Sequence, residues 1–222
     1  MKIRCSNLGK LMTASRSKGE LLSETAKRMI EDMFKDDVYG IYKDFSSRYT
    51  DKGIRMEDQA IQFASDVLGW DFGTFKNEDS YSNEYFTGTP DINTDVLLAD
   101  IKCSWSGDTF PFFATEIPNK DYLYQLQGYM ALTGKDTSEL VYCLMNTPMD
   151  MVEDEVRRAH WKYHLMEEDL ELRDVIQKQH NFDHIPKEKR IKRFIIERDD
   201  KVITAMQEKV EIAREYYNSL FD

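Results

Sequence analysis

The feature that most constrains this chain is an apolar run that ends in charged residues. The segment "TGTPDINTDVLLADIKCS" places Pro90 and Asp91 on a turn, and nine residues after Asp91 the apolar run ends in Asp100-Ile101-Lys102. Because side chains alternate across a strand, Asp100 and Lys102 are expected to share one face. Buried charges are costly unless they pair with each other or with a metal ion. We therefore expect a fold that brings these groups together.

Two carboxylates that converge on such a turn form an oxygen-rich site suited to Mg²⁺ or Mn²⁺. Asp91 and Asp100 are the candidate ligands, and the backbone carbonyl of Ile101 is a candidate third ligand. Lys102 is placed to orient a water molecule or to neutralise developing charge. The alternative interpretation is a solvated hairpin end with a salt bridge between Asp100 and Lys102.

Two expected helices add polar residues to this candidate site. Glu57 lies in line with the apolar positions of a helix over residues 54–68, although a glutamate in a first turn also favours the helix dipole. Gln125 and Tyr129 are four residues apart on a helix over residues 121–132, so they share a face. Gln125 is a candidate to hydrogen-bond a water molecule, a ligand or the lysine. The alternative is an ordinary amphipathic helix.

The order of the expected elements indicates one domain, residues 1–222, of mixed α/β class. Ser6 and Ser23 are expected to cap the first two helices, and residues 35–51 are expected to be irregular. The helices are expected over residues 7–12, 24–34, 54–68, 121–132, 150–160, 166–177 and 201–220. Strands are expected over residues 81–89 and 95–103, paired as a hairpin, and over residues 139–146 and 192–200.

Composition narrows the class of protein. No apolar run reaches the roughly 18 residues of a membrane span, and the first residues lack the core of a signal peptide, so a cytoplasmic protein without membrane contact is expected. The net charge of −11 argues against coating nucleic acid by bulk electrostatics, but not against an enzyme with a local basic track. Candidates for that track are Arg48, Lys52, Arg55, Lys76 and Lys120.

Taken together, these motifs resemble those of the PD-(D/E)xK nucleases. Pro90-Asp91 and Asp100-Ile101-Lys102 match the central motif. The segments "IRCSNLGKLMTASRSKG", "KGIRMEDQAIQFA", "YLYQLQGYMALTG" and "FIIERDDKVITAMQEKV" resemble, in order and over nearly the whole chain, those of the YqaJ-type viral recombinase family, to which lambda exonuclease belongs. The resemblance implies a restriction-endonuclease-like core, with a central mixed β-sheet flanked by helices.

The resemblance also implies an activity. It is that of a Mg²⁺-dependent exonuclease, with Mn²⁺ as a substitute, which digests duplex DNA from a 5′ end and leaves 3′ overhangs for phage-type recombination. By position, Asp91 and Asp100 would bind the metal ion, with Glu57 assisting. Lys102 would activate the attacking water, and Gln125 would position that water or the lysine. The family further implies a homotrimeric ring, a single-strand annealing protein as partner and the cytoplasm of a bacterial host.

Contacts with the DNA end follow from the same resemblance. Ser6 and Thr89 align with hydroxyl residues that hold the 5′-terminal phosphate. The arginine that family members place upstream of that serine would precede Met1 in this chain. Trp105, just past the lysine, and Tyr129 are our further candidates for substrate contact.

Two other functions remain open from the sequence. An endonuclease of the same fold would need a DNA-reading appendage, for which the chain has little spare length. A non-catalytic scaffold for an annealing protein would have no need of the charged groups of Asp91, Asp100 and Lys102.

Overall fold

The structure is a computed structural model that describes residues 1–42, 47–70 and 74–221. Its central sheet has four strands. The strand order is β4-β5-β6-β7, in which β5 and β6 are parallel and the outer pairs are antiparallel. Parallel neighbours need a crossover connection, and α4 (Lys120–Thr133) supplies it. The strands are β4 (Ile92–Asn93), β5 (Leu98–Cys103), β6 (Thr137–Cys143) and β7 (Ile191–Glu197).

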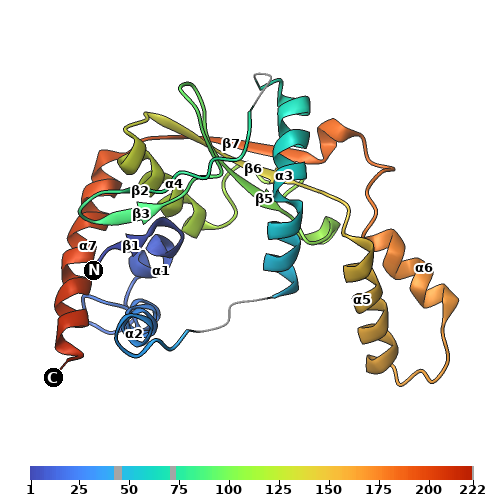
Figure 1. Cartoon of the computed structure of the whole chain (residues 1–222), viewed down its shortest axis with the longest axis horizontal. Helices are drawn as coiled ribbons and strands as arrows, with labels where there is room; N and C mark the ends of the chain where they lie inside the picture. The colour runs from blue at the N-terminus through green and yellow to red at the C-terminus, as the bar shows by residue number, and fades with distance from the viewer. Residues whose placement is uncertain (43–46, 71–73, 222) are drawn as a thin grey trace.

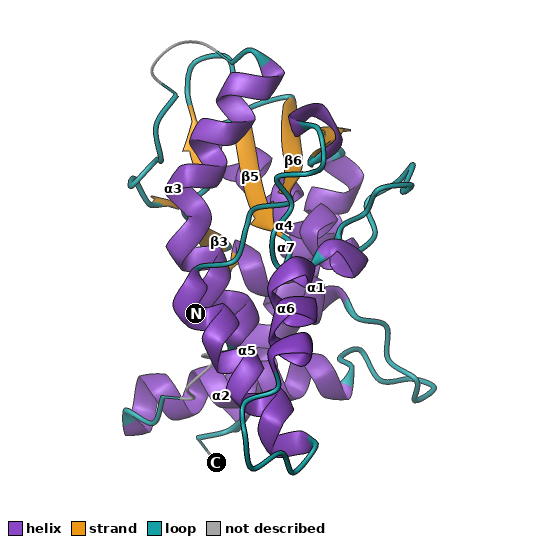
Figure 2. Ribbon diagram, turned by 90° about the vertical axis from the view of Figure 1, so that its right-hand side faces the viewer, coloured by secondary structure: helices purple, strands orange, loops and turns teal. Residues whose placement is uncertain are grey.

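Helices cover both faces of this sheet (Figures 1 and 2). On one face, Ala99 and Ile101 pack with buried residues of α3 (Arg48–Leu68). On the other face, Leu98 belongs to the main core, which includes residues of α4 and of the C-terminal helix α7 (Asp200–Ser219). The alternation of side chains along β5 is therefore as predicted, and the mixed α/β class is confirmed.

A second, smaller sheet corrects the expected hairpin. It consists of β1 (Ile3–Arg4), β3 (Phe86–Gly88) and β2 (Tyr81–Ser82), with β1 parallel to β3. The partner of β5 in its own hairpin is the short β4, not residues 81–89. Pro90 lies between β3 and β4, and its missing N–H cannot extend a ladder of hydrogen bonds. The chain therefore changes sheets at this turn.

The N-terminal helices begin and end differently from the prediction. Ser6 does not cap a helix, because Cys5–Asn7 form a 3₁₀ turn (η1) and α1 (Leu8–Met12) begins after Asn7. Ser23 does cap α2 (Glu24–Tyr39), which continues to Gly40. At the other end of the expected irregular region, Ser47 and Thr50 form a capping box that starts α3. Residues 43–46 of that region lie outside the described residues.

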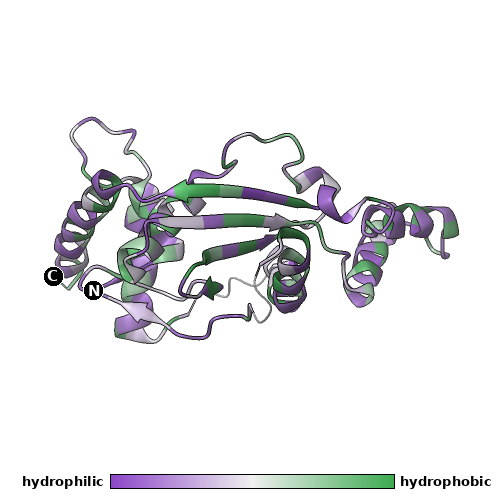
Figure 3. Cartoon of the chain, turned by 90° about the horizontal axis from the view of Figure 1, so that it is seen from above, coloured by the Kyte–Doolittle hydropathy of each residue, from purple (hydrophilic) through white to green (hydrophobic). Residues whose placement is uncertain are grey.

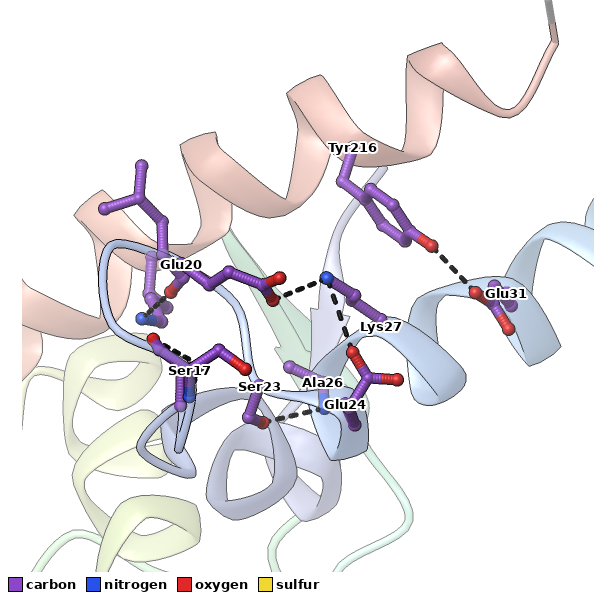
Figure 4. A network of polar contacts seen from close by, with 11 residues as sticks. Ser17, Glu20, Ser23, Glu24, Ala26, Lys27, Glu31 and Tyr216 are labelled. Atoms are coloured by element: carbon purple, nitrogen blue, oxygen red, sulfur yellow. Dashed lines mark hydrogen bonds and ion pairs between the residues drawn. The ribbon is translucent and has the colours of Figure 1, made fainter.

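The packing of α2 against α7 is supported by polar contacts at the surface (Figure 4). The Ser23 hydroxyl accepts a hydrogen bond from the N–H of Ala26 at 3.1 Å. The Tyr216 hydroxyl on α7 donates to the Glu31 carboxylate on α2 at 2.7 Å. Lys27 forms an ion pair of 2.7 Å with Glu20, in the loop before α2. The contact between Tyr216 and Glu31 joins the two helices, while the other two fix the start of α2.

A helical arm extends beyond one end of the sheet (Figures 1 and 3). It consists of α5 (Met149–Lys162) and α6 (Leu170–Gln179), which share a small core of Val152, Val156 and Ile176. The second helix begins later than predicted because Asp169 caps it by accepting from the N–H of Leu172. Short 3₁₀ turns, η2 (Gly107–Thr109) and η3 (Lys187–Lys189), complete the elements. In the part of the chain that is described, no helix has the length and apolar character to cross a membrane.

Candidate active site

Strand β5 carries the two charged side chains that the sequence singled out. Asp100 is 1% exposed, and Lys102 Nζ lies 2.5 Å from Asp100 Oδ2. Gln125 on α4 donates to Asp100 Oδ1 at 3.1 Å. The aspartate is therefore held by its strand neighbour and by the crossover helix. The sequence had suggested a water molecule, a ligand or the lysine as the partner of Gln125, but the bond goes to the Asp100 carboxylate.

Asp91 folds back onto the same strand. Its Oδ2 accepts a hydrogen bond of 2.6 Å from the backbone N–H of Ile101. The turn that begins at Pro90 thus brings the first carboxylate beside the middle of β5, between the positions of Asp100 and Lys102. The two aspartates and the lysine converge as the sequence predicted.

The charge of each group in this cluster affects the pKa of its neighbours. Burial, followed by the charge of Asp100, raises the pKa of Asp91 well above its usual value, while Lys102 and the N–H of Ile101 act in the opposite direction. For Lys102, burial lowers the pKa, but the charges of Asp100 and Asp91 more than offset it and raise the pKa above its usual value. The lysine therefore remains charged while Asp91 is pushed toward its protonated form.

This pair of carboxylates suits a divalent cation. A cation between them would favour the charged form of Asp91, which the surroundings now disfavour. Mg²⁺ is commonly held by one or two carboxylates, with water and substrate oxygens in its other positions. Within residues 1–42, 47–70 and 74–221, no group of three or more histidine, cysteine, aspartate or glutamate side chains is placed to hold a metal ion. The two carboxylates of Asp91 and Asp100 match the number that Mg²⁺ commonly takes from a protein.

Glu57 lies on the α3 side of this cluster. Burial is the main cause of the raised pKa of both Asp91 and Cys103, and the charge of Glu57 raises each of them further. Its Oε2 also forms an ion pair of 2.9 Å with Lys76. Lys76, one of the basic candidates, is thus a neighbour of the site. The side chain of Glu57 is 20% exposed and can be reached from solvent.

A chain of hydrogen bonds continues from Gln125 to the turn before Asp91. Gln125 Nε2 lies 2.8 Å from the hydroxyl of Tyr129, and that hydroxyl donates to the backbone carbonyl of Thr89 at 3.2 Å. Tyr129 is only 4% exposed. Its burial argues against the substrate contact we expected from it, because its hydroxyl is occupied in holding the turn and the glutamine.

The smaller sheet brings the two candidate phosphate-binding hydroxyls toward each other. Strands β1 and β3 pair in parallel, with Arg4 opposite Thr87. Ser6 lies in the 3₁₀ turn that follows β1, Thr89 directly follows β3, and both residues are exposed. The pairing of β1 with β3 therefore brings segments more than eighty positions apart in the sequence side by side, just before Ser6 and Thr89.

Trp105 and Lys52 do not lie where the sequence led us to expect. Trp105 is 8% exposed and Lys52 is fully buried, with Lys52 Nζ donating to the backbone carbonyl of Trp105 at 2.8 Å. Trp105 offers little ring surface for a base, and Lys52 cannot contact DNA from this position. The spacing of Lys52, Met56 and Ala60 by four residues places the lysine on the apolar stripe of α3, and this spacing indicates its burial.

One residue near the site was missed altogether. The ring of Tyr122, in the first turn of α4, lies 4.9 Å from Lys102 Nζ, measured to the ring centroid. Tyr122 precedes Gln125 by three residues, so both side chains lie on neighbouring positions of one helical face. This spacing in "YLYQLQGYMALTG" was the available signal.

Comparison with solved structures shows what the chain is similar to. A phage-related exonuclease from Haemophilus somnus 129PT is 32% identical, with a TM-score of 0.80 over 100% of this chain and 95% of that one. The alkaline exonuclease LHK-Exo from Laribacter hongkongensis has the same fold at 17% identity, with a TM-score of 0.66 over 98% of this chain and 88% of its own. A second structure of LHK-Exo, in complex with dAMP, gives 18% identity and a TM-score of 0.64, with 98% and 88% covered. None of the protein-family models and none of the curated proteins matches the chain.

Proposed function

Because this chain belongs to the YqaJ-type family of phage exonucleases that includes lambda exonuclease, we propose that it digests duplex DNA from a 5′ end with Mg²⁺ as its cofactor. The chain is a deoxyribonuclease of restriction-endonuclease-like fold, and its substrate would be linear double-stranded DNA. The product would be DNA with 3′ single-stranded overhangs, suited to phage-type recombination by strand annealing.

The observation that carries this proposal is the convergence of Asp91, Asp100 and Lys102 on β5. The two aspartates, with the backbone carbonyl of Ile101, would hold Mg²⁺, or Mn²⁺ in its place. Such an ion lowers the pKa of a bound water molecule and stabilises charge on phosphate oxygens. The protein would supply the remaining parts of the reaction itself.

Each side chain has a distinct part in the proposed mechanism. Lys102 would orient the attacking water and neutralise charge that develops on the phosphate. Gln125 would fix Asp100 through the 3.1 Å hydrogen bond, and Tyr129 would fix Gln125 in turn. Glu57 would assist in binding the metal ion from the α3 side, directly or through water. Its ion pair with Lys76 would then loosen or break.

Recognition of the DNA end is assigned to the smaller sheet. The exposed hydroxyls of Ser6 and Thr89 would hold the 5′-terminal phosphate, with Arg4 as a nearby basic residue. This arrangement would place the terminal phosphate beside the turn that carries Asp91. A chain with a net charge of −11 needs such local contacts, because its overall charge repels DNA.

The assembly follows from the family and is proposed with it. The chain would act as one domain over residues 1–222 and form a homotrimeric ring around DNA in the cytoplasm of a bacterial host. A single-strand annealing protein would receive the overhang. In such a ring, the acidic exterior need not face the DNA.

End-labelled DNA tests the proposal directly. Linear duplex labelled at either the 5′ or the 3′ end is incubated with the protein and Mg²⁺, beside covalently closed circular duplex and an Asp100→Ala control. Release of mononucleotides from 5′ ends of linear DNA, abolished in Asp100→Ala, is the expected result. Nicking of the circle would identify an endonuclease instead. No cleavage with Mg²⁺ or Mn²⁺ would favour the non-catalytic scaffold.

A further inference from the structure

Helix α4 presents two side chains to two neighbouring positions of β5. Gln125 contacts Asp100, and Tyr122, one turn earlier, lies against Lys102. Residues three apart on a helix are about 5–6 Å apart, and residues two apart on a strand are separated by about 6.6 Å, so the two spacings match. The helix thus contacts both charged groups of the strand: the amide of Gln125 contacts Asp100, and the ring of Tyr122 contacts Lys102.

The ring of Tyr122 lies within the distance of a cation–π contact. Its centroid is 4.9 Å from Lys102 Nζ, and such contacts form within about 6 Å and strengthen when water is excluded. The ammonium is also 2.5 Å from Asp100 Oδ2, so it is held between a carboxylate and an aromatic ring. This arrangement limits the positions that a flexible lysine side chain can take.

The ring itself is fixed by further aromatic residues. Tyr142 on β6 contacts Tyr122 edge to face, with centroids 6.2 Å apart and planes at 69°. Tyr142 is buried, and it lies opposite Lys102 in the parallel pairing of β5 and β6. Phe194 on β7 packs against Tyr142 in turn, with centroids 6.1 Å apart and planes at 82°. A row of aromatic rings therefore crosses the sheet and ends at the lysine.

We infer that Tyr122 is a positioning residue of the nuclease site, whose ring holds the Lys102 ammonium in place through a cation–π contact backed by Tyr142. The inference rests on the proposed function for its effect on catalysis. The contact itself is a property of the protein without metal or DNA. The ring is the essential part, and the hydroxyl is dispensable.

A series of rings of nearly constant size tests the inference. Residue 122 is replaced by phenylalanine and by its mono-, di- and trifluorinated forms, which progressively weaken the negative face of the ring. Tyr122→Phe is expected to retain most activity, and kcat is expected to fall with each added fluorine while KM changes little. Tyr122→Leu, which lacks a ring, is expected to lose about 5- to 30-fold in kcat, the range of a desolvated cation–π contact.

A matched control uses the same helix. Tyr124 lies two residues further along α4 and packs against the main core. The same fluorinated series at residue 124 is expected to leave kcat unchanged. A kcat that does not respond to fluorination at residue 122, or that responds equally at residue 124, would overturn the inference. So would a large loss in Tyr122→Phe, because it would assign the role to the hydroxyl.

A second measurement is independent of nuclease activity. Urea unfolding in EDTA is compared for Lys102→Met, Tyr122→Leu and the double variant. If the ring and the ammonium interact, the double variant is destabilised by less than the sum of the single variants. Strict additivity would overturn the contact. If the wild-type protein cleaves no DNA, the proposed function fails, but this cycle still decides whether Tyr122 holds Lys102.

Discussion

Two lysines near strand β5 are both shielded from solvent, but their pKa values shift in opposite directions. Lys102 is 25% exposed and has carboxylate neighbours, and its pKa is raised. Lys52 is 0% exposed and donates to a backbone carbonyl, with the rings of Trp105 and Phe182 within 5.8 Å of its ammonium. Burial lowers the pKa of Lys52 to about 8. The groups around a shielded lysine, more than the shielding itself, therefore determine the direction in which its pKa shifts.

The largest expected difference between the two lysines is in activity. Lys102→Met removes the group proposed to orient water and neutralise charge, so kcat on linear duplex is expected to fall by about 10²–10⁴-fold. Lys52→Met leaves Asp91, Asp100 and Lys102 untouched, and its kcat is expected to stay close to that of the wild type. Digestion rates of end-labelled DNA measure both. Similar losses in the two variants would break the comparison.

The next effect is on stability as the pH rises. Lys52 has a pKa of about 8 in the folded protein and its ordinary value of 10.5 when unfolded. Between these values the unfolded chain binds more protons, so the free energy of unfolding increases with pH. The gain contributed by Lys52 is expected to approach about 3 kcal/mol, since each pKa unit corresponds to 1.36 kcal/mol.

Urea unfolding from pH 7 to 10 measures this gain. Cysteines and tyrosines of the unfolded chain also titrate in this range, so the difference between the wild type and Lys52→Met is the informative quantity. That difference is expected to change with pH in favour of the wild type above about pH 8. A difference that is constant with pH would show that Lys52 is not buried as a charge.

The smallest expected effects come from hydroxyl groups that support each lysine. Tyr129→Phe removes the hydroxyl that joins Gln125 to the carbonyl of Thr89, and Thr147→Val removes a hydroxyl that lies 2.9 Å from His180 Nδ1 near Lys52. Each is expected to cost about 1 kcal/mol of stability. Only Tyr129→Phe is expected to lower kcat as well. Equal kcat values in the two variants would show that the chain of bonds from Gln125 is not needed for activity.

The central motif was predictable because it depends on local patterns. Alternation along residues 96–102 placed Asp100 and Lys102 on one face, and the turn at Pro90 left room for Asp91 to fold back toward them. The helix that carries Gln125 was also predicted, to within one residue at each end. The family resemblance then supplied the fold that the solved structures confirm.

What the sequence did not predict depends on contacts between distant segments. Strand β3 pairs with the N-terminal β1, not with β5, and no local pattern specifies such a partner. Trp105 was expected at the DNA, but its burial depends on α3, which packs around it through Lys52. Tyr122 was overlooked because its neighbour, Lys102, lies on another element.

The parallel pairing of β5 and β6 joins two strands that are synthesised at different times, with α4 between them. As the chain leaves the ribosome, β5 emerges before the crossover helix α4 and before its partner strand β6. Asp100 therefore stays hydrated until the segment with Gln125 and Tyr122 has been translated. The burial of Asp100 in the folded protein depends on α4 and β6, so it requires segments that follow Asp100 in the chain.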